Sequence, residues 1–168
     1  MNLATLIVLS TLWATVPYNI TPQAISAQIA SRGAATVLKE LYDDEDVWSD
    51  VLEHIGTGES NWLNIGASLH KASDAGSSED LEVAFFFALN HSATQVLRMS
   101  SPEEMSQICS SNFLIDNRAD KTSLSWADER LKRVKAVKDP LLLQERSSCI
   151  TGLIQARKIV LRWTGHDQ

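Results

Sequence analysis

The sequence predicts an all-α protein: a compact single-domain bundle of about seven or eight helices, with a disulfide expected between Cys109 and Cys149. Apolar residues recur at intervals of three and four along much of the chain, which is the spacing of amphipathic helices. Helix start signals, in which Ser or Asp precedes acidic residues, separate these stretches. No run of alternating β-branched residues lies between turn signals, so no strand is expected.

Length and composition exclude several classes of protein. The 168 residues are 44% hydrophobic, which is enough for one domain with a substantial core and too much for a disordered chain. Fifteen Lys and Arg residues against 21 Asp and Glu residues give a net charge of −6, which argues against a general nucleic-acid binder. Two Cys are too few for a zinc finger or an iron–sulfur scaffold.

The amino terminus is typical of an export signal. Residues 1–31 hold no Asp, Glu, Lys or Arg, and Leu3–Val16 is a block of mainly apolar residues. A membrane-spanning helix needs about 20 apolar residues, so this shorter block matches a secretory signal. Small residues at positions 24, 26 and 27 are suited to a cleavage site. We predict a cleaved signal peptide over residues 1–26, an all-helical domain over residues 27–168, and no membrane span after cleavage. The alternatives are an uncleaved anchor and a buried first helix of a cytosolic protein.

The two cysteines agree with export. Cys109 and Cys149 are 40 residues apart, and a bond between them closes a loop worth roughly 4 kcal/mol on the chain-entropy model. The alternative is a pair of buried free thiols. A redox pair would show C-x-x-C spacing, which this chain lacks.

The first half of the domain contains three amphipathic stretches. Residues 27–42 predict one helix, and the acidic run 43–46 ends that helix or opens the next. Residues 47–55 predict a second helix, which Gly56 and Gly58 stop. A third is expected over residues 61–72.

The second half begins with a helix that is apolar around most of its circumference. Ser77 or Ser78 is expected to cap this helix, whose residues 81–89 predict central burial, and residues 93–99 continue it. Ser101, Pro102 and Glu104 form a capping box for a short helix to Cys109. The remaining segments are expected to be a long loop over 110–123, a helix from Ser125 to about Val137, and a last helix from Asp139-Pro140 to about Trp163.

Sequence patterns for catalysis are missing. Neither G-x-S-x-G nor S-x-x-K occurs, the four His residues are scattered without metal-ligand spacing, and no phosphate-binding glycine motif is present. A glycan hydrolase needs only two carboxylates, and Glu53 and Glu82 are the best candidates, although their helices explain both as surface residues. We therefore expect no catalytic residue, no metal and no cofactor.

Aromatic and basic residues in the second half supply the candidate binding residues. Core or inter-helix packing is the expected role of Trp48, Trp62, Trp126 and Trp163, with Trp163 the one most prone to exposure. Residues 32–104 carry a net charge of −10 and residues 105–168 a net charge of +4, with a basic cluster on one helix. This cluster fits a solvated helix face, or a contact with an acidic partner, an anionic lipid or the acidic half of another copy. The candidate binding surface comprises Trp163, Arg130, Arg133 and Lys135.

The segment from Val47 to Met99 carries short motifs in a characteristic order. They are a helix led by Trp48, the turn Ile55-Gly56-Thr57-Gly58, the pair Trp62-Leu63, the turn Ser73-Asp74-Ala75-Gly76 and a helix ending in Val96-Leu97, followed by Cys109, a basic helix and Cys149. In this order, residues 30–155 resemble a functionally uncharacterised family of small exported bacterial all-helical proteins with two Cys. The resemblance implies an envelope location and a helical fold, and it transfers no catalytic residue. The chain departs from the family in lacking positive side chains before the apolar block and in having Asn90-His91-Ser92-Ala93 where a proline often occurs.

Together these observations predict a non-enzymatic helical protein, periplasmic or secreted, that binds another macromolecule in the cell envelope. The partner is expected to be a protein rather than a nucleic acid, and an inhibitor or immunity-type protein is one form such a binder takes. The alternative is a small glycan-cleaving envelope hydrolase with paired carboxylates. The sequence leaves the oligomeric state open.

Overall fold

The computed structural model describes residues 20–115 and 121–163, and every regular element within them is helical. The elements are α1 (Pro22–Arg32), α2 (Ala34–Tyr42), α3 (Glu45–Gly56), α4 (Ser60–His70), α5 (Ala75–Leu97), α6 (Pro102–Ile115), α7 (Lys121–Ala136), the short 3₁₀ turn η1 (Pro140–Leu142) and α8 (Leu143–Trp163). The predicted all-α class is confirmed.

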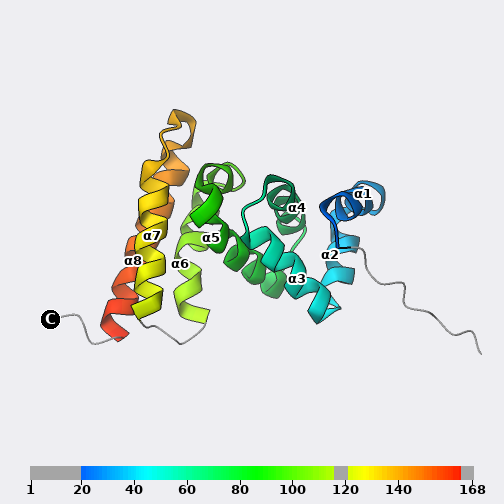
Figure 1. The fold of residues 1–168 in the computed structure, drawn as a ribbon, viewed down its shortest axis with the longest axis horizontal. Coiled ribbons are helices and arrows are strands. Elements are labelled where there is room, and N and C mark those ends of the chain that lie inside the picture. Colours follow the sequence, from blue (N-terminus) through cyan, green and yellow to red (C-terminus); the bar gives the residue numbers. More distant parts are fainter. Residues whose placement is uncertain (1–19, 116–120, 164–168) are drawn as a thin grey trace, which may run out of the picture.

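The chain runs along the long axis of the molecule from α1 and α2 at one end to α7 and α8 at the other, and α6 packs mainly against α8 (Figure 1). Helix α5 is central, because it packs against α3, α4, α6 and α7. The apolar residues around its circumference explain this position: Leu81, Phe85, Phe86 and Leu89 are all buried. Central burial of this helix is therefore confirmed, and Phe87 is the exception described below.

The predicted helix over residues 27–42 is wrong, because the chain forms two helices there. Gly33 has a φ of 86°, a conformation that L side chains rarely adopt, and it separates α1 from α2. Helix α1 begins at Pro22, before the predicted domain start at residue 27, and the side chain of Thr21 caps it. Ile25 of α1 is fully buried in the core, so the fold uses residues that the predicted signal peptide would remove.

Three of the five helix starts predicted from a sequence signal are capped at the residues expected; the start at Ser125 is discussed below. Asp44 caps α3 within the acidic run, and Asp139 accepts a hydrogen bond from the Leu141 N–H at η1. Ser101 and Glu104 bond each other's backbone N–H groups, which is the predicted capping box. At α5 the prediction is wrong: Asp74 is the N-cap, and Ser77, the expected cap, lies three residues inside as its capping-box partner. Asp74 takes this place because its extended backbone precedes the first helical turn.

The predicted loop over residues 110–123 is also wrong. Helix α6 continues to Ile115, and α7 begins at Lys121 rather than at Ser125. The polar residues of this segment do not predict a helix. The helix forms because α6 packs along α8, and these tertiary contacts stabilise it. Gly152 of α8 lets the two helices approach closely, since a Cβ there would lie 2.7 Å from the Ser106 carbonyl oxygen.

None of the helices in residues 20–115 and 121–163 is long and apolar enough to cross a lipid bilayer.

Candidate binding groove between α3 and α5

A hollow of about 550 Å³ lies between α3 and α5. Leu52, Val83, Ala84 and Phe87 make much of its wall apolar, and Glu53 and Asp80 add two carboxylates. Its full lining is Ser49, Leu52, Glu53, Gly56, Asp80, Val83, Ala84 and Phe87. We call this feature the α3–α5 groove. Its volume falls within the range of about 300–1,000 Å³ that is usual for ligand sites.

Helix periodicity explains why these residues share one surface. Positions 49, 52, 53 and 56 form one face of α3, and positions 80, 83, 84 and 87 form the matching face of α5. Gly56, the last residue of α3, adds no side chain to the wall, and a Cβ there would lie in ordinary contact, 3.5 Å from the Cβ of Phe87. The groove is thus formed by two helix faces with a small residue between them.

Two exposed aromatic side chains stand at the edge of the groove. Phe87 is 38% exposed, whereas its neighbours Phe85 and Phe86 are each 1% exposed. The ring of Trp126, from α7, is 40% exposed and lies edge-on to Phe87 at 5.7 Å between centroids. Core or inter-helix packing was expected of Trp126, and the structure has inter-helix packing against α5, with the ring partly exposed rather than in the core. Exposed aromatic pairs of this kind are enriched where proteins bind one another.

Arg130 holds this aromatic edge in place. Its Nε donates a 2.7 Å hydrogen bond to the Phe86 carbonyl oxygen, and Nη1 donates to the Trp126 carbonyl oxygen. The guanidinium carbon lies 4.3 Å from the Phe86 ring centroid and 5.2 Å from that of Phe87. Burial lowers the pKa of Arg130 to about 10, which leaves the group charged at neutral pH.

Arg130 was predicted as a binding-surface residue, and this placement is wrong because its residue surface is only 2% exposed. The charge pattern of α7 conceals the difference between Arg130, which faces α5, and the exposed Arg133 and Lys135. The candidate site residues that the sequence interpretation did not assign to a binding surface are Phe87 and Trp126. Their signal is a Phe at the third position of an FFF run, where helix periodicity turns one ring away from the other two.

The other predicted surface residues do not form one site. Trp163 is 51% exposed at the end of α8, in agreement with its predicted exposure. The Asp128–Arg157 ion pair aligns α7 with the antiparallel α8, so Trp163 lies toward the start of α7 and Lys135 toward its end. The rise of the two helices separates these residues by about 20 Å. A shared contact by Trp163 and Lys135 would need an extended partner.

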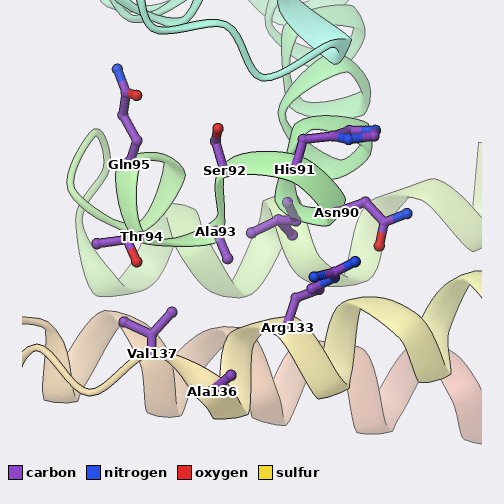
Figure 2. Close-up of a pocket in the computed structure, with 10 residues that line it drawn as sticks. Asn90, His91, Ser92, Ala93, Thr94, Gln95, Arg133, Ala136 and Val137 are labelled. Carbon is purple, nitrogen blue, oxygen red and sulfur yellow. The ribbon is translucent and has the colours of Figure 1, made fainter.

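Arg133 lines a second hollow of about 320 Å³ at the kink of α5, where Ser92 departs from helical geometry (Figure 2). In Figure 2 the side chain of Arg133 extends from α7 toward Asn90. The Nδ2 of Asn90 donates to Glu129, while its Oδ1 is buried without a partner among the described residues. Since Oδ1 is buried, it is not available to a ligand in the hollow. The lining offers the cation of Arg133, and it lacks the aromatic edge of the α3–α5 groove.

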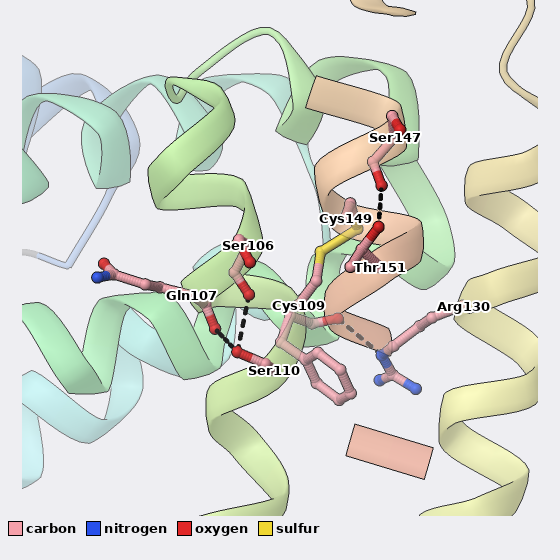
Figure 3. Close-up of a disulfide and its surroundings, with 9 residues drawn as sticks. Ser106, Gln107, Cys109, Ser110, Arg130, Ser147, Cys149 and Thr151 are labelled. Atoms are coloured by element: carbon pink, nitrogen blue, oxygen red, sulfur yellow. Dashed lines mark hydrogen bonds between the residues drawn. A yellow bond between two sulfur atoms is a disulfide. The ribbon is translucent and has the colours of Figure 1, made fainter. Parts of the chain in front are cut away.

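The predicted disulfide is present and joins α6 to α8 (Figure 3). Cys109 and Cys149 are both fully buried, with their Cα atoms 5.1 Å apart. This spacing is ordinary for a disulfide, and Gly152 one turn further along α8 allows the close approach of the helices. The alternative of two free thiols is therefore wrong.

A cluster at the junction of α4 and α5 contains residue types used in hydrolases. His70 Nε2 lies 3.2 Å from Ser78 Oγ and 3.8 Å from Glu82 Oε1. A Ser–His–acid triad needs the serine on one imidazole nitrogen and the acid on the other, whereas both groups here approach Nε2. The cluster therefore links two helices without forming a triad, and Glu82 is engaged there rather than paired with Glu53.

The carboxylate that shares the groove with Glu53 is Asp80. Its Oδ2 accepts a 2.9 Å hydrogen bond from Nε1 of the buried Trp48, which fixes its orientation. Among residues 20–115 and 121–163, no group of three His, Cys, Asp or Glu side chains could hold a metal ion. The groove thus combines an apolar floor, an exposed aromatic edge and two acidic groups.

The described residues form an all-α, disulfide-bonded protein with an apolar recess between α3 and α5. A comparison with protein-family models finds no match, and comparisons with curated proteins and with solved structures find none either. The site is therefore interpreted from its own geometry.

Proposed function

We propose that this protein is an exported, non-enzymatic binding protein, periplasmic or secreted, whose α3–α5 groove receives an apolar side chain of a protein partner in the cell envelope. The observation that carries the proposal is the exposed Phe87–Trp126 pair at the edge of an apolar recess. Large exposed aromatics beside a recess are the usual anchors of protein–protein contacts. An inhibitor or immunity-type role is one form of this function.

The export part of the proposal is supported by the disulfide. Disulfides form and persist mainly in oxidising compartments such as the periplasm or the extracellular space. Fractionation of the native host, with thiol labelling of the recovered protein, tests this part. Oxidised protein in the envelope or medium is expected, and reduced protein in the cytoplasm would contradict it.

Site-specific photo-crosslinking in native cells tests the groove. A photoreactive residue at Leu52 or Val83, both in the groove, is expected to crosslink to the same partner. The control position is Leu141 of η1, which is 86% exposed and does not line the groove. Crosslinks from Leu141 to that partner, or none from the groove, would contradict the proposal.

Binding measurements with the purified partner complete the test. Phe87→Ser and Trp126→Ser are each expected to weaken binding by about 10-fold to 100-fold, as loss of an aromatic anchor does. Leu141→Ser removes an exposed apolar side chain elsewhere and is expected to leave the affinity unchanged. Equal affinity for all four proteins would show that the groove does not bind this partner.

A glycan-cleaving hydrolase is a second candidate, and one observation favours it: Glu53 and Asp80 line the same groove. Paired carboxylates flanking a glycosidic bond are the usual machinery of that reaction. The hydrolase function predicts that purified wild-type protein clears peptidoglycan and that Glu53→Gln abolishes clearing. Lack of clearing by the wild-type protein under conditions where a known muramidase is active would exclude it.

A further inference from the structure

We infer that the partner segment in the α3–α5 groove is a basic amphipathic polypeptide, with Lys or Arg beside the apolar side chain that enters the recess. This inference rests on the proposed function and adds the chemistry of the partner. It follows from the charge of the groove, from the fixed orientation of one carboxylate, and from the engagement of nearby cations in other contacts.

The walls of the groove carry negative charge only. Glu53 on α3 and Asp80 on α5 line it, and no Lys, Arg or His does so. Beyond Glu53, residues 40–70 contain seven further Asp and Glu residues and no Lys or Arg. Charges of one sign around a recess with low-dielectric walls concentrate ions of the opposite sign there.

The acids on α3 extend the negative surface along the helix. Asp46 and Asp50 precede Glu53 by seven and three residues, so helix periodicity places them on or next to the face that carries Glu53. All three are exposed. A segment that lies along α3 therefore meets several carboxylates beside the apolar recess.

Three cations of the acidic half are held in ion pairs of their own. Arg32 pairs with Glu40, Lys39 pairs with Asp43, and Arg98 pairs with Asp139. Arg130, whose guanidinium carbon lies 5.2 Å from the Phe87 ring centroid, is buried behind the aromatic rings. None of these side chains lines the groove, so its carboxylates are available to a partner's cation.

Asp80 is the preorganised acceptor of the pair. The hydrogen bond from Trp48 Nε1 to Oδ2 holds the carboxylate in place, while Oδ1 retains its full capacity to accept hydrogen bonds. A charge-assisted hydrogen bond from Lys or Arg is stronger than a neutral one and adds directional selectivity. The same carboxylates repel an acidic segment, a nucleic acid or an anionic lipid surface, so one set of groups provides both affinity and rejection.

Two peptides of about 16 residues, long enough for four helical turns, test the inference. Both carry the same Leu and Trp residues on one face, and the polar face carries Lys in one peptide and Glu in the other. Wild-type protein is expected to bind the Lys peptide at least about 10-fold more tightly than the Glu peptide at low salt. The difference is expected to shrink between about 50 and about 300 mM salt, because exposed charges are screened.

Single-charge variants locate the effect. Glu53→Gln and Asp80→Asn are each expected to reduce the preference for the Lys peptide several-fold. Glu103→Gln removes an exposed acid at the start of α6, outside the groove, and is expected to leave the preference unchanged. Phe87→Ser is expected to weaken both peptides together, which separates the apolar contribution from the charge contribution.

The results distinguish this inference from the proposed function. Suppose that Leu52 and Val83 crosslink to a partner. Equal binding of both peptides, tighter binding of the Glu peptide, or no binding of either would then overturn the basic-partner inference and leave the groove function standing. Absence of both crosslinks and peptide binding would overturn the two together. A wild-type dimer that Glu53→Gln dissociates in sedimentation would show that a second copy occupies the groove, and would also overturn the inference of a separate basic partner.

Discussion

Arg130 of α7 and Phe86 of α5 are joined in two ways, by a 2.7 Å hydrogen bond from Nε to the carbonyl oxygen and by a guanidinium that lies 4.3 Å from the ring centroid. A buried cation is costly unless polar partners surround it, and the carbonyl groups of Phe86 and Trp126 supply them here. Phe86 directly precedes the exposed Phe87, and Trp126 is itself the other exposed aromatic residue. This contact therefore couples the stability of the α5–α7 packing to the shape of the groove edge.

We expect Arg130→Ala to lower the free energy of unfolding by about 3 kcal/mol, because it creates a cavity and removes the donors to two carbonyl groups. Arg133→Ala, three residues along the same helix and exposed, is the matched control and is expected to change stability by less than about 0.5 kcal/mol. Urea unfolding followed by tryptophan fluorescence measures both. Equal stability of the two variants would show that the buried guanidinium does not support the packing.

A second prediction concerns the Cys109–Cys149 disulfide, which closes a 40-residue separation between α6 and α8. We expect the double variant Cys109→Ala/Cys149→Ala to lose roughly 4 kcal/mol of stability, because its unfolded chain is less restricted. Denaturant unfolding of wild-type protein with and without reductant provides the comparison. Reductant should not change the stability of the double variant. If reductant destabilised the double variant as much as the wild-type protein, the effect would not be due to this disulfide.

The parts of the fold that follow from local chemistry could be predicted from the sequence. The capping box of Ser101 and Glu104 requires only a short sequence pattern, and the Asp139 cap requires only the residue before a proline. The central position of α5 follows from an apolar circumference that water cannot solvate. In each case the decisive groups lie within a few residues of one another.

The remaining features depend on contacts between segments far apart in the chain. Gly33 breaks a continuous amphipathic pattern because its backbone adopts a positive φ, which the pattern of side chains does not reveal. Arg130 is buried because Phe86, 44 residues earlier, offers a carbonyl oxygen to it. The groove depends on how α3 and α5 are aligned against each other. Sequence spacing alone therefore could not show that Glu53 shares the groove with Asp80 rather than with Glu82.

The amino-terminal boundary yields a third prediction. Removing residues 1–26 deletes the fully buried Ile25 and the Thr21 cap, whereas removing residues 1–19 leaves both in place. Loss of a buried Ile side chain and of a cap is expected to cost about 3–5 kcal/mol together. Thermal unfolding of the two shortened proteins measures the difference. Similar melting temperatures would mean that α1 contributes little to the core and would support a boundary at residue 27.

The last prediction concerns the loss of folding stability at acidic pH and the contribution of the contact between Asp139 and Arg98. A hydrogen bond from Arg98 and a second one from the Leu141 N–H hold the pKa of Asp139 below its usual value of 3.8. Since the folded-state pKa is lower than the unfolded one, the stabilisation is fully present well above pH 3.8 and is lost as the pH falls through the folded-state pKa. Protons then bind the folded carboxylate and weaken its contact with Arg98.

Asp139→Asn keeps the size of the side chain and an oxygen that can cap η1, but it removes the charge. We expect this variant to be less stable than wild-type protein at neutral pH and the two to converge at pH values below 3.8, measured by urea unfolding from pH 7 to pH 2. Arg98→Met should reproduce the difference, and about 1 M salt should reduce it, because the Arg98 side chain is 61% exposed and its charge is screened. A stability difference that stays constant down to pH 2 would assign the effect of the substitution to the cap rather than to the ion pair.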